Sequence, residues 1–388
     1  MKKIQEIEVS GKRVLVRVDF NVSLDKEGKV IDDFRIRATW PTINYLKEKG
    51  AKIILLAHLG RPEGKKDLTF SLKPLLEKVN ALNNESVILL EDYLGEGALK
   101  EIEKMKPGGI IMLENLRWHP GEEKNDLEFA KLLARLADVY INDAFAVSHR
   151  AHASVEAITK FLPSGAGLLL QKEVFELSRV RDNPEHPLVA IIGGSKISTK
   201  IKLIQSFFNK AESIILGGAL ANTVLRAKGI AIGKSFFEEK ALSAVKSIPI
   251  TDPKIHLPVD AIVCQNKEAT GLCSIRAVGK VNDEEMLLDI GPDSEKLFSQ
   301  IIARAKMVVW NGPMGLFENE TFSHGTRAIA QAIANSSAYS LVGGGETVAF
   351  LEKESLIDDF SFVSTGGGAM LEFLAGEPMP GILALEKK

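Results

Sequence analysis

The chain has few cysteines and no long apolar run. Cys264 and Cys273 are the only cysteines in 388 residues. Their spacing fits neither a CxxC pair nor a zinc pattern, so we expect two reduced thiols in a cytosolic protein. Apolar runs such as Ile53 to Ala57 span about five residues, whereas a membrane helix needs roughly 18. The N-terminus becomes acidic at Glu6 before a signal region can form. A cytoplasmic protein without a membrane partner is therefore expected.

An excess of charge of either sign is also missing. Lysine and arginine total 49, aspartate and glutamate 51, and the net charge is −2. Because general nucleic-acid binders usually carry a basic excess, no nucleic-acid partner is expected. The content of 45% hydrophobic and 26% charged residues is typical of a globular protein. A chain of this length exceeds a single core of ordinary size, which suggests two domains.

Two nucleotide-binding motifs are absent from the sequence, GxxxxGK[ST] and GxGxxG. The first absence weighs against a P-loop ATPase, and the second against an NAD-dependent dehydrogenase. Any nucleotide site in this chain must therefore use other loops.

Short apolar runs rich in β-branched residues recur along the whole chain. Most are continuous rather than alternating, as in strands buried on both faces of a parallel sheet. Helical patterns lie between them, for example the stripe of Ile197, Ile201, Ile204 and Phe208. This alternation predicts an α/β fold with two halves of five or six strands each. The expected strands are Val14–Val18, Ile53–Ala57, Val87–Leu90, Gly109–Leu113, Val139–Ile141, Leu188–Ile192, Ser213–Leu216, Ile255–Val259, Met307–Trp310, Ser340–Val342 and Phe360–Val363.

The chain divides near its middle. The segment 168–181 has helical spacing and meets the turn Asp182-Asn183-Pro184-Glu185-His186-Pro187. A helix that ends in a proline-rich turn is a good candidate for a connector between domains. We therefore place an N-terminal domain at 1–170 and a C-terminal domain at 171–370, beginning with this helix.

Basic and polar residues follow the apolar runs of the first half or lie in adjoining loops. Ligands of parallel α/β sheets bind outside the carboxyl ends of the strands. Arginine suits bidentate recognition of phosphate or carboxylate. Any one of these arginines could be a solvated charge or part of a local salt bridge, but the set predicts a cationic pocket. The segments are Asp19-Phe20-Asn21, Arg35, His58-Leu59-Gly60-Arg61-Pro62, Arg117-Trp118-His119 and Ser148-His149-Arg150-Ala151-His152.

Glycine-rich segments follow the apolar runs of the second half. Glycine allows close approach of backbone to ligand, and free N–H groups at a following helix start bind anions. One such loop is weak evidence, whereas five in one half-chain predict a polyphosphate ligand. They are Gly193-Gly194-Ser195-Lys196, Gly217-Gly218-Ala219, Asn311-Gly312-Pro313-Met314-Gly315, Gly343-Gly344-Gly345-Glu346-Thr347 and Gly366-Gly367-Gly368-Ala369.

Lys196 and Lys200 lie four residues apart at the expected start of the helix 197–208. Like charges at this spacing repel, and cations are disfavoured at a helix N-terminus. A solvated pair is the ordinary interpretation of two such lysines. A phosphate between them would reverse both penalties, so after Gly193-Gly194 we favour a phosphate-binding role.

These segments together resemble the phosphoglycerate kinase family, in the expected order and over essentially the whole chain. The matching segments in the first half are Arg17-Val18-Asp19-Phe20-Asn21-Val22, His58-Leu59-Gly60-Arg61-Pro62, Glu114-Asn115-Leu116-Arg117, Asn142-Asp143-Ala144-Phe145 and His149-Arg150-Ala151-His152-Ala153-Ser154. Those in the second half are Gly193-Gly194-Ser195-Lys196, Leu257-Pro258-Val259-Asp260, Asp289-Ile290-Gly291-Pro292, Trp310-Asn311-Gly312-Pro313-Met314-Gly315 and Ser364-Thr365-Gly366-Gly367-Gly368-Ala369.

The resemblance implies two Rossmann-like domains facing each other across a hinged cleft, with the segment 371–388 returning to the N-terminal domain. It implies that 3-phosphoglycerate or 1,3-bisphosphoglycerate is held by Asp19, Asn21, Arg35, His58, Arg61, Arg117 and Arg150. ADP or ATP with Mg²⁺ would be held by Lys196, Lys200, Gly217, Gly218, Asn311, Pro313, Gly315, Glu318, Gly344, Gly345, Glu346 and Thr347. The expected catalytic groups are Arg35, Lys196, Lys200, Gly367 and Gly368, and the expected metal ligand is Glu346.

Two positions depart from the family pattern. Glu346 stands where the family usually has Asp, and Ala219 where a third glycine is common. The first departure bears on metal geometry and the second on the wall of the adenosine pocket.

The expected activity is reversible, Mg²⁺-dependent transfer of a phosphoryl group from 1,3-bisphosphoglycerate to ADP by a monomeric enzyme. Phosphoryl transfer requires positioning and neutralisation of charge, so direct in-line transfer after domain closure suffices. One alternative is an NAD-dependent oxidoreductase, which predicts the absent GxGxxG. The other is a non-catalytic protein that binds phosphometabolites or nucleotides, which would tolerate loss of the basic residues in one half.

Overall fold

The computed structural model describes residues 1–83, 86–246, 248–249 and 251–386. The chain forms two compact units: Met1–Phe175 with the segment from Pro378 onward, and Glu176–Glu377. The divisions expected from the sequence lie at 170 and 370; residues 387–388 of the expected final segment lie outside the described residues. No helix in the described part of the chain combines the length and apolar composition needed to cross a bilayer.

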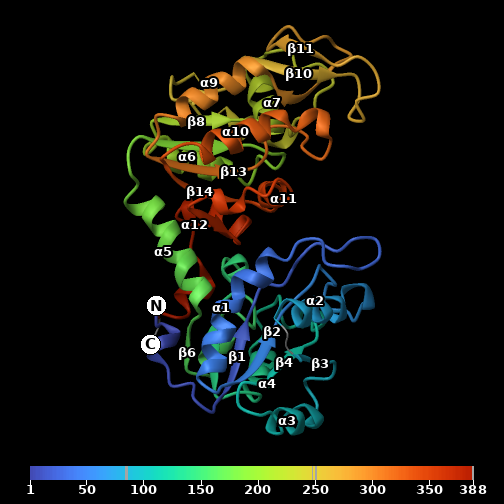
Figure 1. The fold of residues 1–388 in the computed structure, drawn as a ribbon, viewed down its shortest axis with the longest axis vertical. Helices are drawn as coiled ribbons and strands as arrows, with labels where there is room; N and C mark the ends of the chain where they lie inside the picture. Colours follow the sequence, from blue (N-terminus) through green and yellow to red (C-terminus); the bar gives the residue numbers. More distant parts are fainter. Residues whose placement is uncertain (84–85, 247, 250, 387–388) are drawn as a thin grey trace. The chain divides into compact units, whose positions relative to one another are not determined.

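The first unit contains a six-stranded sheet with the order β3-β4-β2-β1-β5-β6 (Figure 1). All its strand pairs are parallel, and Val16 of β1 pairs with Leu55 of β2 and Ile141 of β5. The strands are β1 (Arg13–Arg17), β2 (Lys52–Leu56), β3 (Ile88–Leu90), β4 (Ile110–Leu113), β5 (Val139–Asn142) and β6 (Ser164–Ala166). The helices are α1 (Phe34–Glu48), α2 (Lys73–Asn83), α3 (Glu96–Glu103), α4 (Leu127–Ala134) and α13 (Pro380–Leu383).

Both faces of this sheet are buried, which explains the continuous apolar runs. Val14 and Val16 of β1 pack into one core with residues of α1 and α2. Leu15, on the opposite face, packs into a second core with residues of α3 and α4. A strand between two helical layers has no polar face, so the prediction of a parallel sheet is confirmed.

The second unit contains another parallel sheet, with the order β15-β14-β13-β7-β8-β9. Its strands are β7 (Leu188–Ile192), β8 (Ser213–Leu216), β9 (Ile255–His256), β13 (Met307–Asn311), β14 (Tyr339–Gly343) and β15 (Phe362–Ser364). The helices are α5 (Leu168–Asp182), which begins in the first unit, α6 (Ile201–Phe208), α7 (Gly218–Ala227), α8 (Leu242–Val245), α9 (Pro292–Ile302), α10 (His324–Ala334), α11 (Gly345–Lys353) and α12 (Gly368–Leu374).

A small antiparallel sheet in the second unit was not predicted. It has the order β11-β10-β12, formed by β10 (Asp260–Cys264), β11 (Ser274–Ala277) and β12 (Met286–Ile290). Strand β11 alternates between half-buried and exposed residues, so it lacks the continuous apolar run of the other strands. Pairing of Val263 with Ser274 places Cys264 beside Cys273, with Cα atoms 4.5 Å apart, and the two form a disulfide. The expectation of two reduced thiols was therefore wrong, because the hairpin brings together cysteines that are nine positions apart.

Candidate active site

Two of the predicted residues, Asp19 and Asn21, lie in the loop after β1, beside the loop after β2. The backbone N–H of Asn21 donates to Asp19 Oδ1 at 3.2 Å. The side-chain oxygen of Asn21 accepts from the N–H of Gly60, which follows β2, at 2.9 Å. The loops after two neighbouring strands are thus tied to each other at the carboxyl edge of the sheet.

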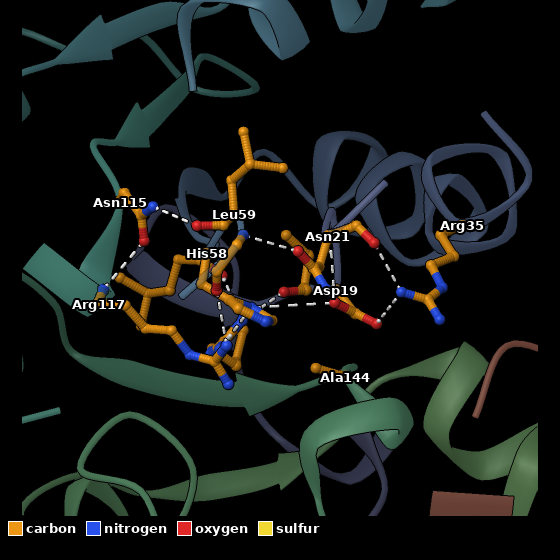
Figure 2. Close-up of polar contacts among 12 residues, drawn as sticks. Asp19, Asn21, Arg35, His58, Leu59, Asn115, Arg117 and Ala144 are labelled. Atoms are coloured by element: carbon orange, nitrogen blue, oxygen red, sulfur yellow. Dashed lines mark hydrogen bonds and ion pairs between the residues drawn. The ribbon is translucent and has the colours of Figure 1, made fainter. Parts of the chain in front are cut away.

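Arg35 reaches the same place from a helix rather than from a strand end. It lies in the first turn of α1 and is half-buried. Its Nη1 donates to the carbonyl of Asn21 at 2.7 Å and lies 3.2 Å from Asp19 Oδ2 (Figure 2). The ion pair with Asp19 orients the guanidinium beside the polar edge of the sheet.

His58 lies between Asp19 and the arginines and is 2% exposed. Burial, together with the positive charges of Arg17 and Arg117, holds the pKa of the imidazole well below its ordinary value. His58 is therefore neutral at neutral pH. It can donate a hydrogen bond to an anion but contributes no charge.

The other histidines of the predicted cationic pocket are neutral as well. Burial lowers the pKa of His149 to about 4 and that of His152 to about 3. His119 stacks on Phe129 with ring centroids 3.9 Å apart. Among the described residues of these segments, the positive charge therefore comes from the arginines.

Arg117 follows β4 and is almost fully buried. The side chain of Asn115 accepts from its backbone N–H at 3.0 Å and fixes the turn, while Nη1 of Arg117 donates to the carbonyl of Gly60 at 2.9 Å (Figure 2). Burial lowers the pKa of Arg117 to about 10, opposed by Glu123, whose carboxylate lies 3.2 Å from Nε. The guanidinium stays charged at neutral pH but lacks a full set of partners, because its buried Nε makes no hydrogen bond with the described residues. An incoming anion would compensate this charge.

Arg150 and Arg61 complete the predicted phosphoglycerate set. Nε of Arg150 donates to Nε2 of His149 at 3.0 Å, and its charge contributes to the lowered pKa of Arg117. Arg61 is exposed and makes no hydrogen bond or ion pair with these groups within the described residues. The structure therefore gathers six of the seven residues and leaves Arg61 beside them.

The second unit contains a cavity of about 460 Å³. Its walls are mainly apolar and include Ala219, Leu288 and Met314. Such a cavity, with a few polar groups at one end, is typical of a small-molecule site. Five predicted nucleotide residues line it: Gly218, Pro313, Gly315, Glu318 and Glu346.

Glycines make the narrow end of the cavity possible. Gly194 has φ +81°, and a Cβ there would lie 2.8 Å from Nζ of Lys200 and 3.6 Å from Oε2 of Glu346. At Gly218, with φ +58°, a Cβ would lie 2.8 Å from the backbone nitrogen of Gly194. Larger residues would fill the space in which backbone N–H groups and Lys200 meet a ligand.

Lys200 is buried and donates to the carbonyl of Gly193. Burial lowers its pKa to about 8; Glu346 opposes this shift and Lys196 adds to it. Helix α6 begins at Ile201, not at residue 197 as predicted. Lys200 is therefore its N-cap, and Lys196 is exposed in the loop before it. The two lysines therefore do not share a helix face, although each still acts on the other's charge.

Asn311 and Thr347 shape the loop after β13 rather than facing open space. The side-chain amide of Asn311 donates to the carbonyl of Gly343 at 2.8 Å. Thr347 is fully buried, and its hydroxyl accepts from the N–H of Gly312 at 2.8 Å. Both bonds hold the ends of β13 and β14 together beside the cavity.

Three helices begin at the other predicted glycines. Gly217 is the N-cap of α7, Gly344 with φ +106° is that of α11, and Gly367 with φ +50° is that of α12, which begins at Gly368. Gly345 and Glu346 are the first two residues of α11, and both are exposed. A carboxylate in the first turn of a helix is favoured by the helix dipole, and here it also lines the cavity.

The carboxylates of the second unit suit a magnesium ion that is carried by a ligand rather than one held by the protein alone. No cluster of three or more His, Cys, Asp or Glu residues suited to a metal occurs within the described part of the chain. Mg²⁺ usually keeps several waters and is held by one or two carboxylates plus substrate phosphates. Glu346, exposed at the cavity close to Lys200, fits such an ion carried by a nucleotide.

Two buried residues that organise the first site were not predicted as site residues. Asn115 donates to the carbonyls of Leu59 and Phe70, and Arg17 contacts His58. Arg17 lies in a segment that resembles the family. It could also have been singled out as a candidate because it is a charged residue at the end of an apolar strand. Asn115 could have been singled out by its place two residues before Arg117, where it caps a turn.

The comparisons with known proteins agree along the whole chain. The family model described as phosphoglycerate kinase matches residues 4–377. A phosphoglycerate kinase of Pseudothermotoga lettingae is 47% identical over 100% of both chains, and one of Desulfosudis oleivorans is 45% identical over 100% of this chain and 99% of that protein.

Solved structures agree as well. The structure of phosphoglycerate kinase from Coxiella burnetii has a TM-score of 0.84 and 41% identity, covering 99% of this chain and 98% of that one. The enzyme from Pyrococcus horikoshii OT3 has a TM-score of 0.90 and 32% identity, covering 100% and 98%. The chain belongs to the phosphoglycerate kinase family.

Proposed function

We propose that this protein is a phosphoglycerate kinase that transfers a phosphoryl group reversibly between 1,3-bisphosphoglycerate and ADP, giving 3-phosphoglycerate and ATP. The observation that carries the proposal is the presence of two complementary sites in one chain. One unit gathers Arg35, Arg117 and Arg150 with a neutral His58, and the other encloses a glycine-lined cavity beside Lys200. Membership in the family supports the same activity.

The arginine cluster is proposed to bind the phosphoglycerate. Its carboxylate and phosphate groups match the bidentate geometry of guanidinium donors. Arg117 would supply a buried positive charge, while Asp19 and Asn21 hold Arg35 and the loop after β2 in place. Arg61, exposed on that loop, would make its contact only when the substrate is bound.

The cavity of the second unit is proposed to bind the nucleotide. Its apolar walls would take the adenosine, and the segments around Gly194, Gly218 and Gly344 would present backbone N–H groups to the phosphates. Lys196 and Lys200 would neutralise phosphate charge, and Glu346 would hold Mg²⁺ together with the nucleotide phosphates. When bound, Mg²⁺ neutralises charge that develops on the phosphate oxygens.

Transfer is proposed to be direct and in line, without a covalent enzyme intermediate. The phosphoglycerate and nucleotide residues belong to different units. We therefore propose that binding of both substrates closes the units and excludes water, which would hydrolyse the acyl phosphate. Arg35, Lys200 and the N–H groups around Gly367 and Gly368 are the proposed sources of charge neutralisation at that step.

The alternative is a protein that binds phosphometabolites or nucleotides without catalysing transfer. Such a protein would need only one of the two sites, so the presence of both favours the kinase. We also propose a monomer, since one chain supplies both sets of residues; size-exclusion chromatography with light scattering tests this. A cytoplasmic location is proposed separately, and fractionation of the source cells tests it.

The purified protein should form ATP from ADP and 1,3-bisphosphoglycerate in a coupled assay, with an absolute need for Mg²⁺. The reverse reaction should proceed with ATP and 3-phosphoglycerate, and no NAD⁺ reduction should occur with hydroxy acids. Calorimetric binding of both ligands by folded protein without Mg²⁺-dependent ATP formation would instead establish the non-catalytic alternative.

A further inference from the structure

Arg17 is a fully buried arginine at the end of β1, where every other buried residue of the strand is apolar. A buried charge is costly unless it is paired and its donors are satisfied. Arg17 meets this demand with Nη1 bonded to the carbonyl of Val18 at 2.5 Å and Nε bonded to Ser154 Oγ at 2.9 Å. Nη1 also lies 3.4 Å from the carbonyl oxygen of Leu56, and Nη2 contacts a residue of the proposed phosphoglycerate site.

That contact determines the position of a proton. Nη2 of Arg17 lies 3.2 Å from Nδ1 of His58. A guanidinium can only donate, so Nδ1 must accept with its lone pair. In a neutral imidazole the single proton then resides on Nε2, and burial keeps the ring neutral by lowering its pKa.

A second group near Nδ1 favours the opposite tautomer. Asp19 Oδ1 lies 3.9 Å from Nδ1 and would accept a proton carried there. That distance is too long for a hydrogen bond, whereas the distance to Arg17 is within range. The geometry therefore selects the Nε2–H form, and Nε2 contacts no polar partner among the described residues.

The charge of Arg17 is balanced through a hydroxyl. Ser154 Oγ accepts from Arg17 and donates to Glu122 Oε1 at 2.5 Å. Glu122 is fully buried and also accepts from the backbone N–H of Ser154 at 3.0 Å. A continuous buried chain of hydrogen bonds thus links Glu122, Ser154, Arg17 and His58.

We propose that Arg17 is a positioning residue that holds His58 as a neutral Nε2–H donor toward an anionic oxygen of the phosphoglycerate, with Ser154 and Glu122 fixing Arg17. The inference rests on the proposed function for the identity of the ligand. The tautomer itself is a property of the ligand-free protein. A merely structural Arg17 would stabilise the strand ends without setting the proton of His58.

Nitrogen NMR of the full-length protein labelled at histidine tests the tautomer directly, with His58→Gln used to assign the ring. We expect an unprotonated Nδ1 and a protonated Nε2 at neutral pH in the ligand-free protein. A protonated Nδ1 would overturn the inference. This readout does not depend on catalysis, so it separates failure of the inference from failure of the proposed kinase activity, which is read as the absence of ATP formation by the wild type.

Arg17→Met and Arg17→Lys form a matched pair. Arg17→Met removes the donor, so the Nδ1–H form should appear and KM for 3-phosphoglycerate should rise by about tenfold or more, the scale of one hydrogen bond to a charged group. KM for ATP should stay unchanged. Arg17→Lys keeps a donor and should restore the Nε2–H form and part of the affinity.

Ser154→Ala provides a milder variant should Arg17→Met not fold. It removes the hydroxyl between Arg17 and Glu122 while leaving the guanidinium in place. We expect part of the Nδ1–H form and a smaller rise in KM for 3-phosphoglycerate. An unchanged tautomer in every folded variant, with both KM values unchanged, would reduce Arg17 to a structural residue.

Discussion

Arg35 Nη1 lies 3.2 Å from Asp19 Oδ2 while it donates to the Asn21 carbonyl at 2.7 Å. The guanidinium is thus held at one nitrogen, and Nη2 has no partner among the described residues. A held but unsatisfied donor is suited to bind charge that develops in a transition state.

Arg35→Ala should therefore lower kcat on the order of 10²–10³ and weaken 3-phosphoglycerate binding far less. Steady-state kinetics in the ATP-forming direction and calorimetry with 3-phosphoglycerate measure the two effects. Arg35→Lys keeps the positive charge but lacks the second terminal nitrogen of the guanidinium. Its kcat should therefore lie between those of the wild type and Arg35→Ala. A change confined to KM would make Arg35 a uniform-binding residue.

Lys200 predicts a pH dependence of activity. Burial lowers its pKa to about 8, so it loses its positive charge above that pH. Since that charge is proposed to neutralise nucleotide phosphates, kcat/KM for the nucleotide should fall as pH rises through about 8. Lys200→Arg should be slower but flat to higher pH, because guanidinium remains protonated.

The stability of the protein should change in the opposite direction. Between pH 8 and the ordinary lysine value of 10.5, the unfolded chain holds a proton on Lys200 that the folded chain lacks. The free energy of unfolding therefore increases as the pH rises through this window, and Lys200→Met should abolish that increase. Asp289, whose pKa is raised from 3.8 to about 8 by burial, makes the free energy of unfolding fall as the pH rises between these two values. Asp289→Asn is the control, because both groups titrate near pH 8. The decrease of kcat/KM above pH 8 should persist in this variant; if it disappears, the decrease is due to Asp289 and not to Lys200.

The parallel sheets could be predicted because their strands carry an unmistakable local pattern. A strand such as β7, buried at every position, must be a continuous apolar run. Strand β11 alternates and packs one face only, so nothing in its four residues separates it from a loop. The disulfide was unpredictable for the same reason, because it depends on the register of Val263 with Ser274.

The positions of site residues could be predicted more readily than their contacts. Strand ends in a parallel sheet share one edge, so the order of apolar runs and polar residues suffices to place Asp19, His58 and Arg117 together. The start of α6 could not be predicted, because Glu238, about 40 positions away, accepts from the N–H groups of Ile197 and Ser198 and holds them outside the helix. Likewise, the neutral state of His152 follows from burial, which the sequence does not report.

Loss of the disulfide should weaken both stability and nucleotide binding. The disulfide closes the loop 265–272. Lys267 of this loop lines the cavity, and its backbone carbonyl accepts a hydrogen bond from the side-chain amide of Asn319. A disulfide that closes a loop of this length contributes roughly 2–3 kcal/mol to the free energy of unfolding. The double change Cys264→Ser with Cys273→Ser should lower the free energy of unfolding by that amount and weaken ADP binding. Dithiothreitol should reproduce both effects in the wild type and neither in the double variant.

Closure should require both substrates, since each unit is proposed to hold one of them. Small-angle X-ray scattering should show a smaller radius of gyration with 3-phosphoglycerate and Mg-ATP together than with either alone. Arg117→Ala should retain nucleotide binding but lose the compaction, because it removes the buried charge that is proposed to recognise phosphoglycerate. An unchanged radius in the ternary complex would contradict closure.

Glu346 is one of the two positions at which we expect this chain to depart from the family pattern. It is exposed, lines the cavity and lies in the first turn of α11. A carboxylate beside polyphosphate is repulsive unless a cation lies between them, which favours a role toward Mg²⁺. The ordinary alternative is a helix-start acid stabilised by the dipole, worth about 0.3–1 kcal/mol.

Two substitutions of Glu346 separate these roles. Glu346→Ala should lower kcat and raise the Mg²⁺ concentration needed for half-maximal activity, with little effect on 3-phosphoglycerate affinity. Glu346→Asp should retain most activity, because Mg²⁺ accepts ligation directly or through one of its waters. Activity titrated with Mg²⁺ at fixed nucleotide, alongside thermal unfolding without nucleotide, measures both properties. A lowered melting temperature with unchanged Mg²⁺ dependence would leave only the helix-start role, because the dipole acts on the carboxylate whether or not a metal is bound.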